Sequence, residues 1–76
     1  MHAFRKQIAS DVTRDGLAIE LVDTDGERVV EVFRHDDEGG VLTFNSFGEV
    51  SIPFDVIVDF VNDAIRAFAT PKPHRP

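Results

Sequence analysis

The apolar residues of this chain change their spacing once, at Pro53, and this change limits the fold more than any other feature. Before Pro53, short runs alternate apolar side chains with other residues, the pattern of strands with one face in a core. After Pro53, apolar residues recur every three or four positions, as in an amphipathic helix. The sequence therefore predicts an α+β domain in which an antiparallel sheet is followed by one C-terminal helix.

Turn signals rich in Asp, Asn and Gly separate the runs that are expected to form strands. A parallel crossover needs about a dozen residues, so the short connections favour an antiparallel meander. The expected strands are residues 17–22, 27–34, 41–44 and 49–52, and the turn signals are residues 14–16, 23–26, 36–40 and 45–48.

Residues 1–13 fit two structures. Phe4, Ile8 and Val12 are four positions apart, as in a short helix, whereas residues 8–13 also fit an edge strand that runs into the turn at Arg14. We favour the strand, so the sheet is expected to have four or five strands.

The predicted helix begins at Pro53, whose missing N–H has no helical partner at the first position. Asp55 in its first turn and Arg66 in its last turn complement the helix dipole. The helix should stop at Thr70, which precedes a proline. Residues 1–70 are thus expected to form a single domain, and residues 71–76 a disordered proline-rich tail.

Charge is distributed unevenly along the 76 residues, which carry a formal charge of −6. Residues 15–63 hold thirteen acidic residues against only Arg28 and Arg34, while both ends are basic. Nucleic-acid binding draws most of its affinity from clustered Lys and Arg side chains. Charge therefore disfavours nucleic acid as a partner.

The chain contains no cysteine, so it has neither disulfides nor thiolate chemistry, and its stability must come from packing. No run approaches the roughly 18 apolar residues of a membrane span, and the first twenty residues lack the apolar centre of a signal peptide. We therefore expect a cytoplasmic protein without a membrane partner.

Two clusters have residue types that bind metals. His35 is followed by Asp36, Asp37 and Glu38, but adjacent loop residues are expected to point in different directions. The run of residues 23–27 resembles part of a calcium loop, yet Val32 stands where a calcium loop has its bidentate glutamate. The sequence therefore predicts no metal and no cofactor.

Nucleophilic catalysis would rest on Ser10, Ser46 or Ser51, and none of the three lies in a nucleophile-elbow pattern. Gly39 and Gly40 lead into an expected strand rather than a helix, so they do not form a phosphate-binding loop. The protein is expected not to be an enzyme.

The sheet face turned away from the helix is the predicted interaction surface. In the strand 27–34, either Val29 and Phe33 or Val30 and Val32 point outward, and in both cases an apolar stripe is rimmed by charge. Such a stripe is typical of a self-association or partner surface. We expect a homodimeric protein-interaction module that binds itself and another protein through Val22, Val29, Phe33 and Val41.

A strand at residues 28–34, an acidic glycine loop, and Gly48-Glu49-Val50-Ser51-Ile52 before a helix together resemble the positive cofactor four family of transcriptional coactivators. These are small dimeric proteins that bind single-stranded DNA. The resemblance covers roughly residues 17–68. It implies DNA binding by aromatic stacking and arginine contacts, at Arg28, Arg34 and Phe47. The family has lysines where this chain has Ser46 and Phe47, so DNA binding is the alternative to protein binding.

Overall fold

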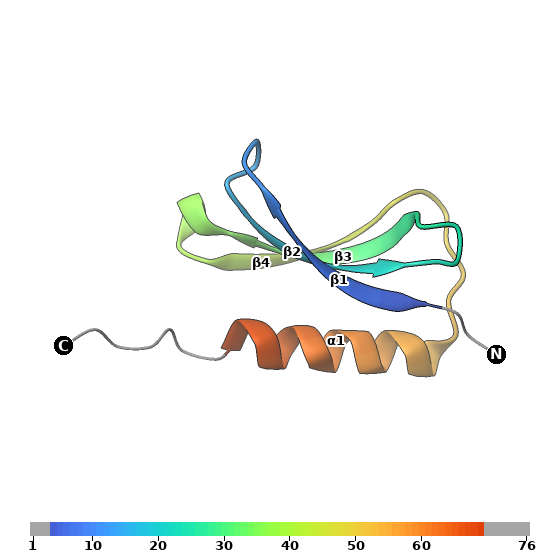
Figure 1. The fold of residues 1–76 in the computed structure, drawn as a ribbon. Coiled ribbons are helices and arrows are strands. Elements are labelled where there is room, and N and C mark those ends of the chain that lie inside the picture. Colours follow the sequence, from blue (N-terminus) through green and yellow to red (C-terminus); the bar gives the residue numbers. More distant parts are fainter. Residues whose placement is uncertain (1–3, 70–76) are drawn as a thin grey trace.

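A computed structural model describes residues 4–69 and shows a four-stranded antiparallel sheet with one helix against one face (Figure 1). The strands pair in chain order, so the sheet is a meander, and the predicted α+β class is confirmed. The elements are β1 (Arg5–Asp11), β2 (Gly16–Val22), β3 (Arg28–His35), the short 3-10 helix η1 (Asp36–Glu38), β4 (Val41–Ser46) and α1 (Phe54–Ala69).

The core lies between the helix and the centre of the sheet, on the face that we call the helix face. Phe60 and Ala64 of α1 are each 1 % exposed. They pack against four buried strand residues, Ile19, Leu21, Val30 and Val32.

The pairing register decides which side chains share a face. Ile8, Ile19, Val32 and Phe44 are direct partners across the four strands, so they form one row on the helix face. Side chains alternate along a strand, so the neighbours of this row lie on the opposite face, which we call the outer face. Val30 and Val32 therefore face the helix, and Phe33 faces outward.

Near one end of β3 the alternation is interrupted. The register between β2 and β3 shifts between Leu21 and Val22, which leaves Val29 without a direct partner. Val29 is half-buried and packs against the core. The prediction that Val29 and Phe33 share the outer face is thus wrong for Val29, because an irregularity in pairing breaks the two-residue period.

Predicted element positions differ from the structure at two places. Residues 1–13 contain the favoured strand, but it occupies Arg5–Asp11. The expected strand at residues 49–52 does not form: after Gly48, with φ 81°, the chain crosses from the sheet to the helix layer. Val50 and Ile52 are apolar because they pack against the core from this crossing segment. The predicted tail at residues 71–76 lies outside the described residues.

Candidate functional site

A row of polar side chains crosses the outer face. Gln7, Glu20, Glu31 and Asn45 are direct partners across the four strands. Among residues 4–69 no helix or second sheet covers this face, yet Glu20 is 4 % exposed and Glu31 is 0 % exposed. A buried carboxylate is costly unless it is paired, so its partners decide what this face can do.

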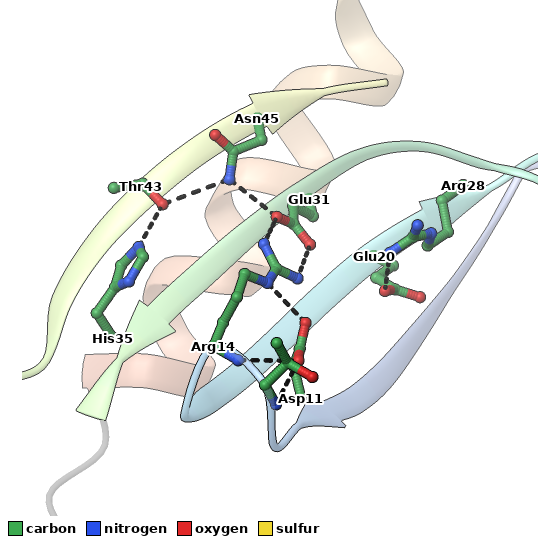
Figure 2. A network of polar contacts seen from close by, with 9 residues as sticks. Asp11, Arg14, Glu20, Arg28, Glu31, His35, Thr43 and Asn45 are labelled. Carbon is green, nitrogen blue, oxygen red and sulfur yellow. Dashed lines mark hydrogen bonds and ion pairs between the residues drawn. The ribbon is translucent and has the colours of Figure 1, made fainter. Parts of the chain in front are cut away.

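Arg14 is the principal partner of Glu31 (Figure 2). From the turn between β1 and β2, its guanidinium donates two hydrogen bonds to the Glu31 carboxylate, at 2.6 and 3.1 Å. The Arg14 Nε also donates to Asp11 at 2.6 Å, and the Asn45 amide donates to Glu31 at 2.8 Å. These contacts tie the β1–β2 turn to β3 and β4.

The network stays charged at neutral pH. Burial by itself raises the pKa of Glu31, but hydrogen bonds from Arg14 and Asn45 outweigh it, so the pKa is lowered. The side-chain hydrogen bond from Arg14 is the largest cause of the lowered pKa of Asp11. The hydrogen bond to Glu31 in turn raises the pKa of Arg14.

Glu20 is held by a separate set of contacts. It accepts a hydrogen bond from the Gln7 amide at 2.7 Å and forms an ion pair with Arg28 at 3.4 Å. The Arg28 guanidinium also lies 4.3 Å from the ring centre of Phe47. Among the described residues, every buried side-chain nitrogen and oxygen has a hydrogen-bond partner. The polar side chains of the outer face therefore satisfy one another's hydrogen bonds and cover the sheet.

Phe33 is fully buried on this face, although no apolar layer from residues 4–69 covers it. The Arg14 guanidinium lies 4.0 Å above the ring centre, and the His35 ring meets the Phe33 ring edge-on with centres 4.6 Å apart. A Cβ at Gly16 would collide with the Phe33 ring and the Arg34 carbonyl. Glycine is therefore required at Gly16 because the neighbouring strand approaches it closely.

The predicted partner face must be corrected. Val22 and Phe33 are each 0 % exposed, Val29 is half-buried and packs against the core, and of the four only Val41 is exposed, at 51 %. The outer face is therefore not an apolar stripe. The alternation along β2 and β3 predicts that Glu20 and Glu31 lie on the outer face. It does not predict that arginine side chains lie over the apolar residues beside these carboxylates.

Exposed apolar side chains lie instead on the helix face, beside β4. Leu42 and Phe44 are 45 % and 53 % exposed, and Val58 and Ile65 of α1 are 40 % and 54 % exposed. A groove of about 290 Å³ runs between β4 and α1. It is lined by Val30, Phe44, Ser46, Val50, Ile52 and Ile57.

The apolar flank of α1 points toward β4. Phe54, Val58, Val61 and Ile65 are four, three and four positions apart, so they form one stripe along the helix. This stripe adjoins Ile57, which lines the groove with Phe44. We call Leu42, Phe44, Phe54, Val58 and Ile65 the β4 surface.

The other flank of α1, beside β1, is acidic. Lys6 of β1 forms ion pairs with Asp59, at 3.2 Å, and with Asp63. A second groove of about 270 Å³ lies here, and we call it the β1 groove. Its lining residues are Phe4, Lys6, Leu21, Asp55, Val56, Asp59 and Phe60.

The three predicted nucleic-acid contacts do not share one surface. Arg28 and Phe47 stack on each other on the outer face. Arg34 lies on the helix face, where it binds Asp36 at 2.7 Å and sits 5.4 Å from the ring centre of Phe68. Sequence spacing alone did not show this separation, because it depends on the register of β3.

The acidic loop after β3 brings some of its side chains together. The ligand atoms of His35, Asp37 and Glu38 lie within 4.8 Å of one another, so the prediction that they diverge is wrong for these three. Asp37 and Glu38 are exposed, and His35 Nε2 is hydrogen-bonded to the Thr43 hydroxyl at 3.0 Å.

Asp23 shapes a local turn. Its carboxylate accepts hydrogen bonds from the backbone N–H groups of Asp25 and Glu27, at 2.9 and 3.0 Å. This is the ordinary use of an aspartate at the start of a turn.

No protein-family model matches the chain, and comparisons with curated proteins and with solved structures give no significant match. The resemblance to the positive cofactor four family is therefore not tested and stays a prediction. Within residues 4–69, no helix has the length and apolar character that crossing a membrane requires.

Proposed function

We propose that this protein is a non-enzymatic, homodimeric protein-interaction module whose two copies join through the β4 surface. The observation that carries the proposal is the contiguous apolar surface of β4 and α1, next to an edge strand that contains no charged residue. Exposed apolar patches mark interaction sites. Edge strands without charges or prolines readily pair with another chain.

A second copy is the occupant that fits this surface. Antiparallel pairing of the two β4 strands about a two-fold axis continues the sheet and keeps both helices on the same face. Leu42 and Phe44 of both copies then fill the space between the helices. Neither β4 nor the apolar stripe of α1 carries a charge, so self-pairing brings no like charges together.

The opposite edge is a poorer place for self-association. Pairing through β1 would bring two acidic helix flanks toward each other, with Asp55, Asp59 and Asp63 on each side. Like charges across an interface oppose association. The charge distribution therefore favours the β4 edge.

The area of the β4 surface is sufficient for a dimer. Its five apolar side chains expose on the order of 500 Å². Each partner in a standard interface buries about 800 Å², of which a polar rim makes up a large part. The strand edge and the polar groups around the apolar residues supply the remainder.

Sedimentation equilibrium of matched variants tests the dimer. We expect the wild-type chain to have twice its 8.5 kDa mass at tens of micromolar. Phe44→Lys should be monomeric, because it places a charge at the centre of the interface. Ile8→Lys should remain dimeric, since Ile8 is 67 % exposed on the same face but at the other edge. A monomeric wild-type protein at several hundred micromolar, or dissociation by Ile8→Lys alone, would contradict the proposal.

Single-stranded DNA binding is the second candidate, and the stacked pair of Arg28 and Phe47 supports it, since bases stack on such groups. A labelled oligonucleotide titrated at low salt tests it. Tight binding that weakens steeply with salt and is lost in Arg28→Ala would favour this candidate over protein binding.

A further inference from the structure

We propose that the β1 groove binds an extended, basic segment of another protein, which adds to the sheet as a fifth strand beside β1. This extends the protein-interaction function proposed above by naming the chemistry of the partner. It does not depend on dimerisation, because β1 and β4 are opposite edges of the sheet.

The edge of β1 supplies the backbone partners. Among residues 4–69, β1 pairs with β2 alone, so its other side presents backbone N–H and C=O groups. Extended peptides bind to such edges through main-chain hydrogen bonds, and adjoining pockets select their side chains. The β1 groove is the adjoining pocket, because it lies between this strand and the first half of α1.

The groove combines an apolar lining with acidic groups. Four of its seven lining residues are apolar, whereas Asp55 and Asp59 are exposed carboxylates on α1, and the Asp59 side chain is 71 % exposed. Lysine and arginine side chains fit this combination, because their alkyl stems cover apolar surface while their charged ends stay near water and acids.

Lys6 already shows the geometry of such a contact. It lies on the helix face of β1, and its ammonium group reaches the carboxylates of Asp59 and Asp63 on α1. A strand added to the edge lies about 4.8 Å beyond β1. Its helix-facing side chains, every second residue, would then approach the acidic flank from the other side. The expected partner sequence therefore has Lys or Arg at alternate positions.

The acidic charge of the chain also favours a basic partner. Thirteen of its acidic residues fall within residues 15–63, with only Arg28 and Arg34 to balance them. An acidic peptide or a polyphosphate chain would be repelled on approach, whereas a basic segment would be attracted.

Fluorescence anisotropy with three labelled octapeptides tests the proposal. The first alternates lysine and valine, the second has glutamate in place of lysine, and the third is the lysine peptide with N-methylated backbone amides. We expect the lysine peptide to bind, the glutamate peptide not to bind, and N-methylation to weaken binding about tenfold by removing main-chain hydrogen bonds.

Two double variants with the same change in net charge locate the site. Asp55→Asn with Asp59→Asn should weaken binding of the lysine peptide about tenfold, the loss expected from two exposed ion pairs. Asp37→Asn with Glu38→Gln removes two exposed charges of η1, which lies at the end of the sheet opposite the groove, and should change binding less than about twofold. The thermal midpoints of both variants should stay near that of the wild type.

Three results would overturn the proposal. Equal weakening by the two double variants would mean general charge attraction, and undiminished binding of the N-methylated peptide would exclude strand addition. Tighter binding of a labelled single-stranded oligonucleotide, titrated without the peptide, would favour nucleic acid as the partner and overturn the proposal. The Phe44→Lys variant separates the test of peptide binding from the test of dimerisation. This variant is expected to be monomeric, and it should bind the peptide as tightly as the wild type does.

Discussion

The two faces of the sheet are buried in opposite ways. The helix face is closed by apolar side chains at its centre and leaves apolar side chains exposed at its edges, whereas the outer face buries two carboxylates under arginines. One helix is about 10 Å wide, while four strands span roughly 15 Å between the edge strands, so the helix leaves both edges uncovered. On the outer face, the side chains of Arg14 and Arg28 cover the sheet in place of a helix or a second sheet. The candidate binding surfaces therefore flank the helix.

The largest expected effect compares two fully buried phenylalanines, one on each face. Phe60→Ala should lower the free energy of unfolding by about 4 kcal/mol, because an apolar core cannot fill the cavity. Phe33→Ala should cost about 2 to 3 kcal/mol, since water and the Arg14 side chain can occupy part of the space. Urea denaturation at one low protein concentration measures both. Equal losses would show that the polar cover packs as tightly as the helix does.

A smaller loss of the free energy of unfolding is expected when Arg14, which covers the outer face and pairs with Glu31, is replaced. Arg14→Met leaves the buried Glu31 carboxylate with Asn45 as its remaining partner. The expected loss is about 2 kcal/mol, below the value for a fully buried pair because the Arg14 side chain is 35 % exposed.

The matched variant for this prediction removes both charges. Arg14→Met combined with Glu31→Met should recover most of the lost free energy of unfolding, because no unpaired charge stays buried. If the double variant is less stable than Arg14→Met alone, the outer face needs its ion pair for packing rather than for charge compensation.

The outer face should also make stability depend on pH. Folding lowers the pKa values of Glu31 and Asp11, so their contribution is complete above the unfolded values of about 4. It is lost as the pH falls through the lower folded values. Urea midpoints should therefore decrease as the pH falls below about 5.

Glu31→Gln tests the origin of this pH dependence. It should flatten the decrease of the urea midpoint, whereas Glu27→Gln, at an exposed turn position, should leave it unchanged. An unchanged pH profile in Glu31→Gln would mean that other carboxyl groups control acid unfolding.

The sequence predicted the helix and three of the four strands from their periods, and it favoured the first strand over a helix. It placed a fifth strand at residues 49–52 because Val50 and Ile52 alternate, and alternation does not distinguish pairing from packing under a crossing segment. It wrongly predicted an apolar stripe on the outer face, because the cover of Phe33 depends on how far the Arg14 side chain reaches across a twisted sheet. Leu42 and Phe44 lie on the helix face, as partners of Arg34 and Val32. Both side chains are exposed because one helix is narrower than the sheet. The local pattern of the sequence does not predict this difference in width.

The smallest expected effect on the folded monomer concerns the apolar edge of the helix face. Leu42→Thr keeps a good strand former at a position that is 45 % exposed, so the unfolding free energy of the monomer should change by about 0.5 kcal/mol or less. Urea denaturation in the monomeric Phe44→Lys background measures this change. In the wild-type background, sedimentation equilibrium should show weaker self-association for Leu42→Thr. A loss above about 1.5 kcal/mol in the monomer would instead place Leu42 in the core, because only a side chain already removed from water loses that much on truncation.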